Sequence, residues 1–137
     1  MTNASLAQSY LRKASDRLDV LELLLTKEAY SDVVRKAQEL VELALKGMLR
    51  SIGIEPPKLH DVGGLLVDHR ERFPEDVRNQ LTDLAGISNR LRKERELAVY
   101  GDLDFIPTEE YSLEDARKAQ QDAQRVVQAA RRVIAGV

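Results

Sequence analysis

The sequence predicts an all-α fold, an antiparallel up-and-down bundle of four main helices plus one short helix, in a single domain over residues 1–137. Apolar residues recur at three- and four-residue spacing in four long stretches, as in amphipathic helices. The four prolines all fall between these stretches, where they mark helix boundaries. No stretch alternates apolar and polar residues over the length of a strand, so we predict no sheet.

The composition limits the kinds of function that the chain can have. Aromatic residues make up only 4% of the chain, so Leu, Val and Ala must fill the core. The formal net charge of -2 argues against nucleic-acid binding through overall charge, so any such contact needs a local basic cluster. Cysteine is absent, which excludes disulfides and thiolate chemistry and fits a cytoplasmic protein.

The first two helices are predicted from periodicity and end signals. The first covers about residues 5–27. The second begins near Ser31, a residue type that favours the N-cap, and Gly53 follows its end, as glycine commonly does after a helix. A short helix over about 61–72 comes next, with Asp61 as its N-cap. These boundaries predict a helical hairpin followed by a short connecting helix.

The fourth helix is predicted from Pro74, in its first turn, to about Val99, with Gly101 as a cap. Residues 102–111 are an acidic loop, and Ser112 opens the last helix with a capping-box sequence. The inward residues of that helix form a narrow Ala/Val stripe, which favours a homodimer. They are Ala116, Ala119, Ala123, Val126, Val127, Ala130 and Ile134.

Two glycines fall inside predicted helices. Gly47 lies in the second helix and Gly86 in the fourth. Glycine costs helix stability relative to alanine, so its presence there needs a reason such as close packing. We therefore predict that both positions mark close helix crossings.

The end of the fourth helix carries the main candidate chemistry. Arg92 and Arg95 lie three residues apart on one face, and Tyr100 follows near the helix end. A guanidinium fork binds phosphate bidentately, and a phenol can donate a hydrogen bond to it. The alternative is a solvated helix end, because cations near a helix C-terminus interact favourably with its dipole and neighbouring glutamates partly neutralise them.

The two histidines are weaker candidates. His60 precedes Asp61 and could act as an acid, base or ligand, or could simply hydrogen-bond the turn. His69 lies in a polar stretch and is expected to be exposed. The chain has no Glu-x-x-His pair and no phosphate-cradling glycine loop, so we predict no metal site and no cofactor. No apolar run is long enough to span a membrane.

Several of these features occur in an order that resembles the HEPN domain family, over about residues 5–134. They are the second-helix segment 30–49, then Gly53, then His60-Asp61-Val62, and finally Arg95-Glu96-Leu97-Ala98-Val99-Tyr100-Gly101-Asp102. The resemblance implies an antiparallel bundle that usually forms a homodimer. Many members are metal-independent ribonucleases whose paired motifs, an Arg followed after four to six residues by a His, meet across the dimer. Others form toxin–antitoxin pairs with a minimal nucleotidyltransferase.

The chain departs from that catalytic motif. Counted from Arg95, the histidine position is occupied by Tyr100. Some members carry a Tyr two residues after the His, and under that alignment the His position falls at Ala98 and Arg92 is the matching arginine. The histidine is absent either way, and a neutral phenol with a pKa near 10 is a poor proton shuttle at pH 7.

The sequence therefore favours a HEPN-like protein that binds a nucleotide, RNA or a nucleotidyltransferase partner through a basic cleft, for example as half of a toxin–antitoxin pair. Arg92 and Arg95 would bind phosphate, Tyr100 would line the cleft, and Asp102 and His60 are further candidates. One alternative is a metal-independent ribonuclease toxin with Arg95 and Tyr100 as catalytic residues. Another is a purely structural dimeric assembly module.

Overall fold

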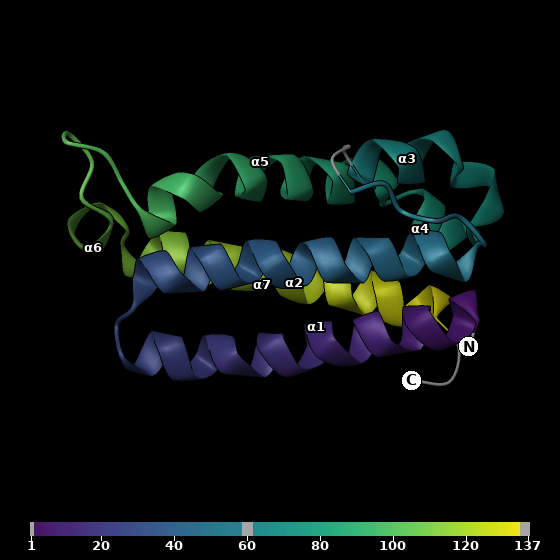
Figure 1. The fold of residues 1–137 in the computed structure, drawn as a ribbon, viewed down its shortest axis with the longest axis horizontal. Coiled ribbons are helices and arrows are strands. Elements are labelled where there is room, and N and C mark those ends of the chain that lie inside the picture. The colour runs from purple at the N-terminus through teal and green to yellow at the C-terminus, as the bar shows by residue number, and fades with distance from the viewer. Residues whose placement is uncertain (1, 59–61, 135–137) are drawn as a thin grey trace.

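The computed structural model describes residues 2–58 and 62–134, and four long helices account for most of them. These helices lie side by side and run alternately in opposite directions (Figure 1), and the all-α fold class is confirmed. The only β pairing in the described part of the chain is one isolated bridge between Asp102 and Phe105. The long helices are α1 (Asn3–Thr26), α2 (Tyr30–Ser51), α5 (Leu81–Val99) and α7 (Leu113–Val133).

Helix α2 is the centre of the bundle, because it packs against α1, α5 and α7. Its apolar stripe repeats every three or four residues, which aligns those side chains on one side of a helix. Burial of this stripe supplies much of the core. The fully buried members include Val33, Ala37, Leu40, Ala44, Leu45, Met48 and Leu49.

Helix ends follow the local sequence signals at several positions. Ser112 Oγ accepts a hydrogen bond from the Asp115 amide at 3.2 Å, and the Asp115 carboxylate accepts one from the Ser112 amide at 2.9 Å, which confirms the capping box. Gly53 follows α2 with a φ of +83°, as a C-terminal cap requires. The predicted N-cap at Ser31 is wrong, since α2 begins at Tyr30 and Ser31 is buried. Asp61 lies outside the described residues.

The fourth predicted helix is two helices. Pro74 is extended, with a ψ of 152°, and precedes the short α4 (Glu75–Arg78), and α5 begins only at Leu81. The Gln80 amide bonds Val77 O at 2.9 Å, while the Gln80 side chain donates to Asp76 O at 3.1 Å. The side chain therefore takes the carbonyl that a continuous α-helix would offer to the backbone of residue 80, and the helix is interrupted there.

The short helix before it is also shorter than predicted. Helix α3 (Val62–Asp68) ends four residues early, and the 3-10 turn η1 (Arg70–Arg72) continues in its place. The His69 amide reaches both Leu65 O and Leu66 O, at 3.2 and 3.3 Å, so the helical turn tightens at that point.

The two glycines inside helices differ in how closely other parts of the chain approach them. A Cβ on Gly47 would lie 3.1 Å from Ile134 Cδ1 and 3.4 Å from Ala7 O, so α2 crosses α1 and α7 closely there, as predicted. A Cβ on Gly86 would meet no atom within 4 Å, and Gly86 is exposed. The predicted crossing at Gly86 is therefore wrong.

Candidate functional site

An open hollow of about 430 Å³ lies between α2 and the C-terminal end of α5. Its lining joins three of the residues singled out in the sequence, Arg92, Arg95 and Tyr100, because the first two share a face of α5 and the third follows directly after it. The sequence did not indicate the third cation, Arg35, which α2 contributes from its second turn. The structure thus places three guanidinium groups from two helices around one hollow.

The described lining of the hollow is rich in cationic side chains. Among the described side chains that line it there is no carboxylate. Arg92 Nη2 donates to Asn89 Oδ1 at 2.8 Å, which orients that guanidinium along α5. Guanidinium groups present several donors in a planar fork that fits a phosphate or carboxylate. The arrangement is suited to binding an anion.

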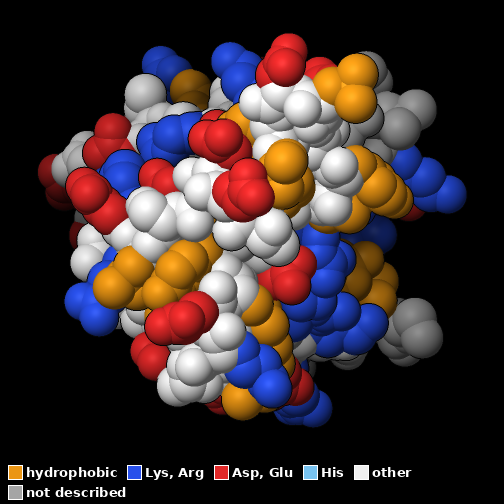
Figure 2. Space-filling view, turned by 90° about the vertical axis from the view of Figure 1, so that its left-hand side faces the viewer, with side chains coloured by type: hydrophobic (Ala, Val, Ile, Leu, Met, Phe, Trp, Pro, Cys, Tyr) orange, Lys and Arg blue, Asp and Glu red, His pale blue; other side chains and the backbone are white. Residues whose placement is uncertain are grey.

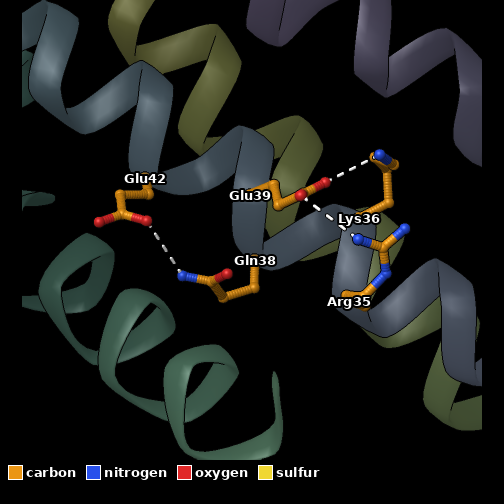
Figure 3. Close-up of polar contacts among 5 residues, drawn as sticks. All are labelled: Arg35, Lys36, Gln38, Glu39 and Glu42. Atoms are coloured by element: carbon orange, nitrogen blue, oxygen red, sulfur yellow. Dashed lines mark hydrogen bonds and ion pairs between the residues drawn. The ribbon is translucent and has the colours of Figure 1, made fainter. Parts of the chain in front are cut away.

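On the α2 side, Arg35 is held by a half-buried carboxylate (Figure 3). Arg35 Nη1 lies 3.4 Å from Glu39 Oε1, and Lys36 Nζ lies 2.8 Å from Glu39 Oε2. Burial opposes ionisation of Glu39, but its contact with Lys36 and the positive charges of Lys36 and Arg35 outweigh that effect and hold the pKa of Glu39 below its usual range. Glu39 is therefore a charged carboxylate at neutral pH.

Tyr100 stands at a turn that the backbone enforces. Its side chain is 82% exposed, and the next residue, Gly101, has a φ of +68°. A Cβ on Gly101 would come within 2.3 Å of Phe105 O and 2.6 Å of Pro107 Cδ, so only glycine fits. The chain leaves α5 sharply here, and the phenol remains at the rim of the hollow.

The two alignments of the family motif place the missing histidine differently. Tyr100 lines the hollow, whereas Ala98 is only 2% exposed and belongs to the core. A side chain at position 98 therefore points away from the arginines of this chain. In the folded chain the Arg95-to-Tyr100 spacing is the one that puts both residues on the hollow.

Of the remaining sequence candidates, Asp102 does not line the hollow. Asp102 Oδ1 accepts a hydrogen bond from the Leu103 amide at 2.6 Å, and the Asp102 backbone pairs with Phe105, so this residue closes a turn. His60 lies outside the described residues. Within residues 2–58 and 62–134, no three His, Asp or Glu side chains gather closely enough to hold a metal ion.

Sequence reasoning also missed the anchor of the acidic loop. Tyr111 donates from its hydroxyl to Glu94 Oε2 at 2.6 Å, and its ring packs edge-on against Phe105 with centroids 5.5 Å apart. Burial, together with the hydrogen bond and charge of Glu94, raises the pKa of Tyr111. This contact fixes residues 102–111, including the short α6 (Pro107–Glu110), beside the helix that carries Arg95.

None of the helices in the described ranges combines the length and apolarity that crossing a membrane requires.

Comparisons with known proteins identify the family. The sequence profile of the HEPN domain matches residues 7–134. A protein of Methanocaldococcus jannaschii named "Putative toxin MJ1304" is 28% identical over 132 residues, which cover 92% of this chain and 86% of that protein. No solved structure matches the chain. The resemblance seen in the sequence is confirmed, and the chain belongs to the HEPN domain family.

Proposed function

We propose that this HEPN chain binds RNA by its phosphates through the hollow between α2 and α5, and that it acts as the toxin half of a toxin–antitoxin pair. The observation that carries the first part is the convergence of Arg35, Arg92 and Arg95 beside an exposed phenol. Cations gathered in one place supply the local cluster that a chain of net charge -2 needs in order to attract a polyanion.

The shape of the hollow favours an RNA strand over a single nucleotide. Small-molecule sites normally enclose most of their ligand, whereas Val99 and Tyr100 on this rim are 38% and 82% exposed. Figure 2 shows this end of the molecule and a group of basic side chains next to hydrophobic ones at its surface. A strand can lay its phosphates along the arginines, and an exposed aromatic ring such as Tyr100 can stack on a base.

Binding is proposed here rather than efficient cleavage. Cleavage through a ribose 2′-hydroxyl needs one group to accept a proton and another to donate one. A guanidinium stays protonated at neutral pH, and a phenol ordinarily donates there. Arg95 and Tyr100 can therefore stabilise a phosphate, but they lack the proton acceptor of the family motif.

Two observations support the proposed role as a toxin with a protein partner: the name of the relative and the apolar surface exposed on this chain. The M. jannaschii relative carries the word toxin in its name. Leu103 and Ile106, in the loop after Tyr100, are 96% and 47% exposed. Clustered apolar side chains at a surface are typical of protein interfaces, which favours, as a second candidate, a protein partner such as a nucleotidyltransferase antitoxin or a second copy of the chain in a homodimer.

The decisive experiment compares two arginine pairs. Arg92→Ala/Arg95→Ala should weaken binding of a labelled single-stranded RNA, measured by fluorescence anisotropy over a range of salt concentrations. The slope of log affinity against log salt should fall by about 0.7 for each phosphate that the variant no longer neutralises, because neutralising a phosphate releases its counterions. The matched control is Arg70→Ala/Arg72→Ala, which removes the same charge from exposed positions near α3, away from the hollow.

Two outcomes decide the matter. A loss of affinity and salt slope in the hollow variant alone supports RNA binding at this site. Equal affinity and slope for wild type and Arg92→Ala/Arg95→Ala, or an equal loss in both double variants, rejects the site and leaves the structural assembly module as the better description.

A further inference from the structure

Arg35 is shared between the hollow, where it can bind an anion, and a carboxylate of its own helix. It lines the hollow, and it also forms an ion pair with Glu39 one helical turn further along α2. The Arg35 and Glu39 side chains are 32% and 29% exposed, so their pairing is only partly screened by water. An anion that enters the hollow must therefore share Arg35 with a carboxylate that is already present.

Glu39 is held more closely by its other partner. Its contact with Lys36 is 2.8 Å long, against 3.4 Å for its contact with Arg35. The contact with Lys36 is therefore the shorter ion pair, while the longer contact with Arg35 is the one that has hydrogen-bond geometry. Lys36 is not among the residues that line the hollow, and Figure 3 shows Lys36 and Arg35 each contacting a different oxygen of the Glu39 carboxylate.

We propose that Glu39 is an internal competitor for the ligand phosphate at Arg35, and that Lys36 limits this competition by holding the Glu39 carboxylate when Arg35 turns to the ligand. The proposal rests on the proposed RNA binding at the hollow and names the residues that set its strength. Arg35 exchanges one oxygen anion for another, while Glu39 keeps a cationic partner throughout. No buried charge is left unpaired in the bound state, which keeps the exchange inexpensive.

A purely structural role for Glu39 predicts the opposite sign. If Glu39 only held Arg35 in a productive position, Glu39→Gln would weaken RNA binding. If Glu39 competes, the same change strengthens binding, by about two- to fivefold for a partly exposed pair of this kind. The direction of the change in affinity separates the two roles.

A second carboxylate on the same helix provides the control for the general effect of removing one negative charge. Glu42 lies one turn further along α2, where it pairs with Lys46 at 3.3 Å and Gln38 at 3.3 Å. Glu42→Gln removes the same charge without touching Arg35, so it should change RNA affinity less than Glu39→Gln does. Circular dichroism checks that both variants keep the helical content of the wild type.

The double-mutant cycle with Arg35 is the specific test. In an Arg35→Ala background, Glu39→Gln should gain no more RNA affinity than Glu42→Gln does, because the group for which Glu39 competes is gone. Lys36→Met should lower affinity more in the wild type than in the Glu39→Gln background, since it leaves Glu39 to Arg35 alone. Unchanged or weaker binding by Glu39→Gln, or an equal gain with and without Arg35, overturns the proposal.

Failure of the proposed role of Glu39 can be distinguished from failure of the proposed RNA binding at the hollow. If Arg92→Ala/Arg95→Ala leaves RNA binding unchanged, the hollow is not the site and the competition falls with it. If that double variant loses binding while Glu39→Gln shows no gain, only the role of Glu39 is rejected.

Discussion

The two ends of the bundle differ in how closely the helices pack and in how much apolar surface they expose. At the closed end, near α3 and α4, the packing around position 47 is so close that a Cβ there would lie 3.1 Å from Ile134 Cδ1. Ion pairing of Arg132 with Asp76 joins α7 to α4 at the same end. At the opposite, open end the helices part around the hollow and the acidic loop. Every large hydrophobic side chain that is exposed in the described part of the chain lies toward the open end. They are Val20, Leu23, Val99, Tyr100, Leu103, Ile106 and Leu113.

This difference separates an end with close helix packing from an end with exposed apolar side chains. Single exposed apolar residues are ordinary, but their concentration at one end is the reason why we propose an interaction surface there. Figure 2 shows that the hydrophobic side chains visible at this end are interspersed with charged ones instead of forming one continuous patch. We therefore expect substitutions of buried residues at the closed end to change stability, and substitutions of exposed residues at the open end to change binding.

The largest effect is expected in catalysis at the open end. Wild-type protein should cleave RNA weakly or not at all with EDTA present, whereas Tyr100→His, which places an imidazole at the motif position, should cleave faster. A well-placed acid–base group contributes about 10²- to 10⁴-fold in rate. The measurement is gel analysis of a structured and a single-stranded RNA. Robust wild-type cleavage that disappears in Tyr100→Phe would instead establish Tyr100 as catalytic.

The closed end should be sensitive to added volume. Gly47→Val should lower the free energy of unfolding by about 1–3 kcal/mol, because the new side chain meets Ile134 and the Ala7 carbonyl in a packed crossing. Gly86→Ala, in open space within α5, should raise it by about 0.5–1 kcal/mol through helix propensity. Urea unfolding followed by circular dichroism gives both values. Equal effects at the two glycines would contradict the close crossing at Gly47.

The loop anchor at the open end should depend on pH. The folded-state pKa of Tyr111 is raised, so the stability that its protonated hydroxyl provides is fully present below the ordinary phenol pKa of about 10 and is lost as the pH rises above it. Tyr111→Phe should be less stable than wild type near neutral pH by about 1 kcal/mol, the typical value of one hydrogen bond. The difference should shrink above pH 10 in urea unfolding. A constant difference across that range would mean that the contact with Glu94 is not the cause.

The smallest stability effect is expected at the tip of the open end. Leu103→Ser should change the free energy of unfolding by less than about 0.5 kcal/mol, since the side chain is 96% exposed. It should nevertheless weaken self-association if the open end is the interface. Light scattering should give twice the 15.5 kDa chain mass for wild type and less for the variant. A wild-type mass of 15.5 kDa at micromolar concentration would rule out the homodimer.

The Ala/Val stripe of α7 is not available as a homodimer interface. The Ala/Val stripe of α7 was expected to leave apolar surface exposed, but its residues, such as Ala116, Ala123 and Val127, are buried in the core of one chain. The apolar surface that remains lies on α1, α5, the acidic loop and the start of α7, at the open end. The homodimer therefore stays a prediction that rests on that end.

The sequence by itself determined what depends on neighbours along the chain. Helical periodicity predicted the four long helices, and the Ser112 capping box and the glycine after α2 were readable from a few residues. The pairing of Arg92 with Arg95 followed from the same rule, because residues three apart share a helix face. Tyr100 was found because it ends that helix.

The tertiary structure alone decided what depends on distances between helices. No spacing in the sequence brings Arg35 of α2 to the arginines of α5, or Tyr111 to Glu94, since such distances are set by how the helices pack. The break at Gln80 depended on a side chain taking a backbone carbonyl from the helix. Side chains on one helix keep fixed offsets, whereas a site shared by two helices exists only after their packing has been chosen.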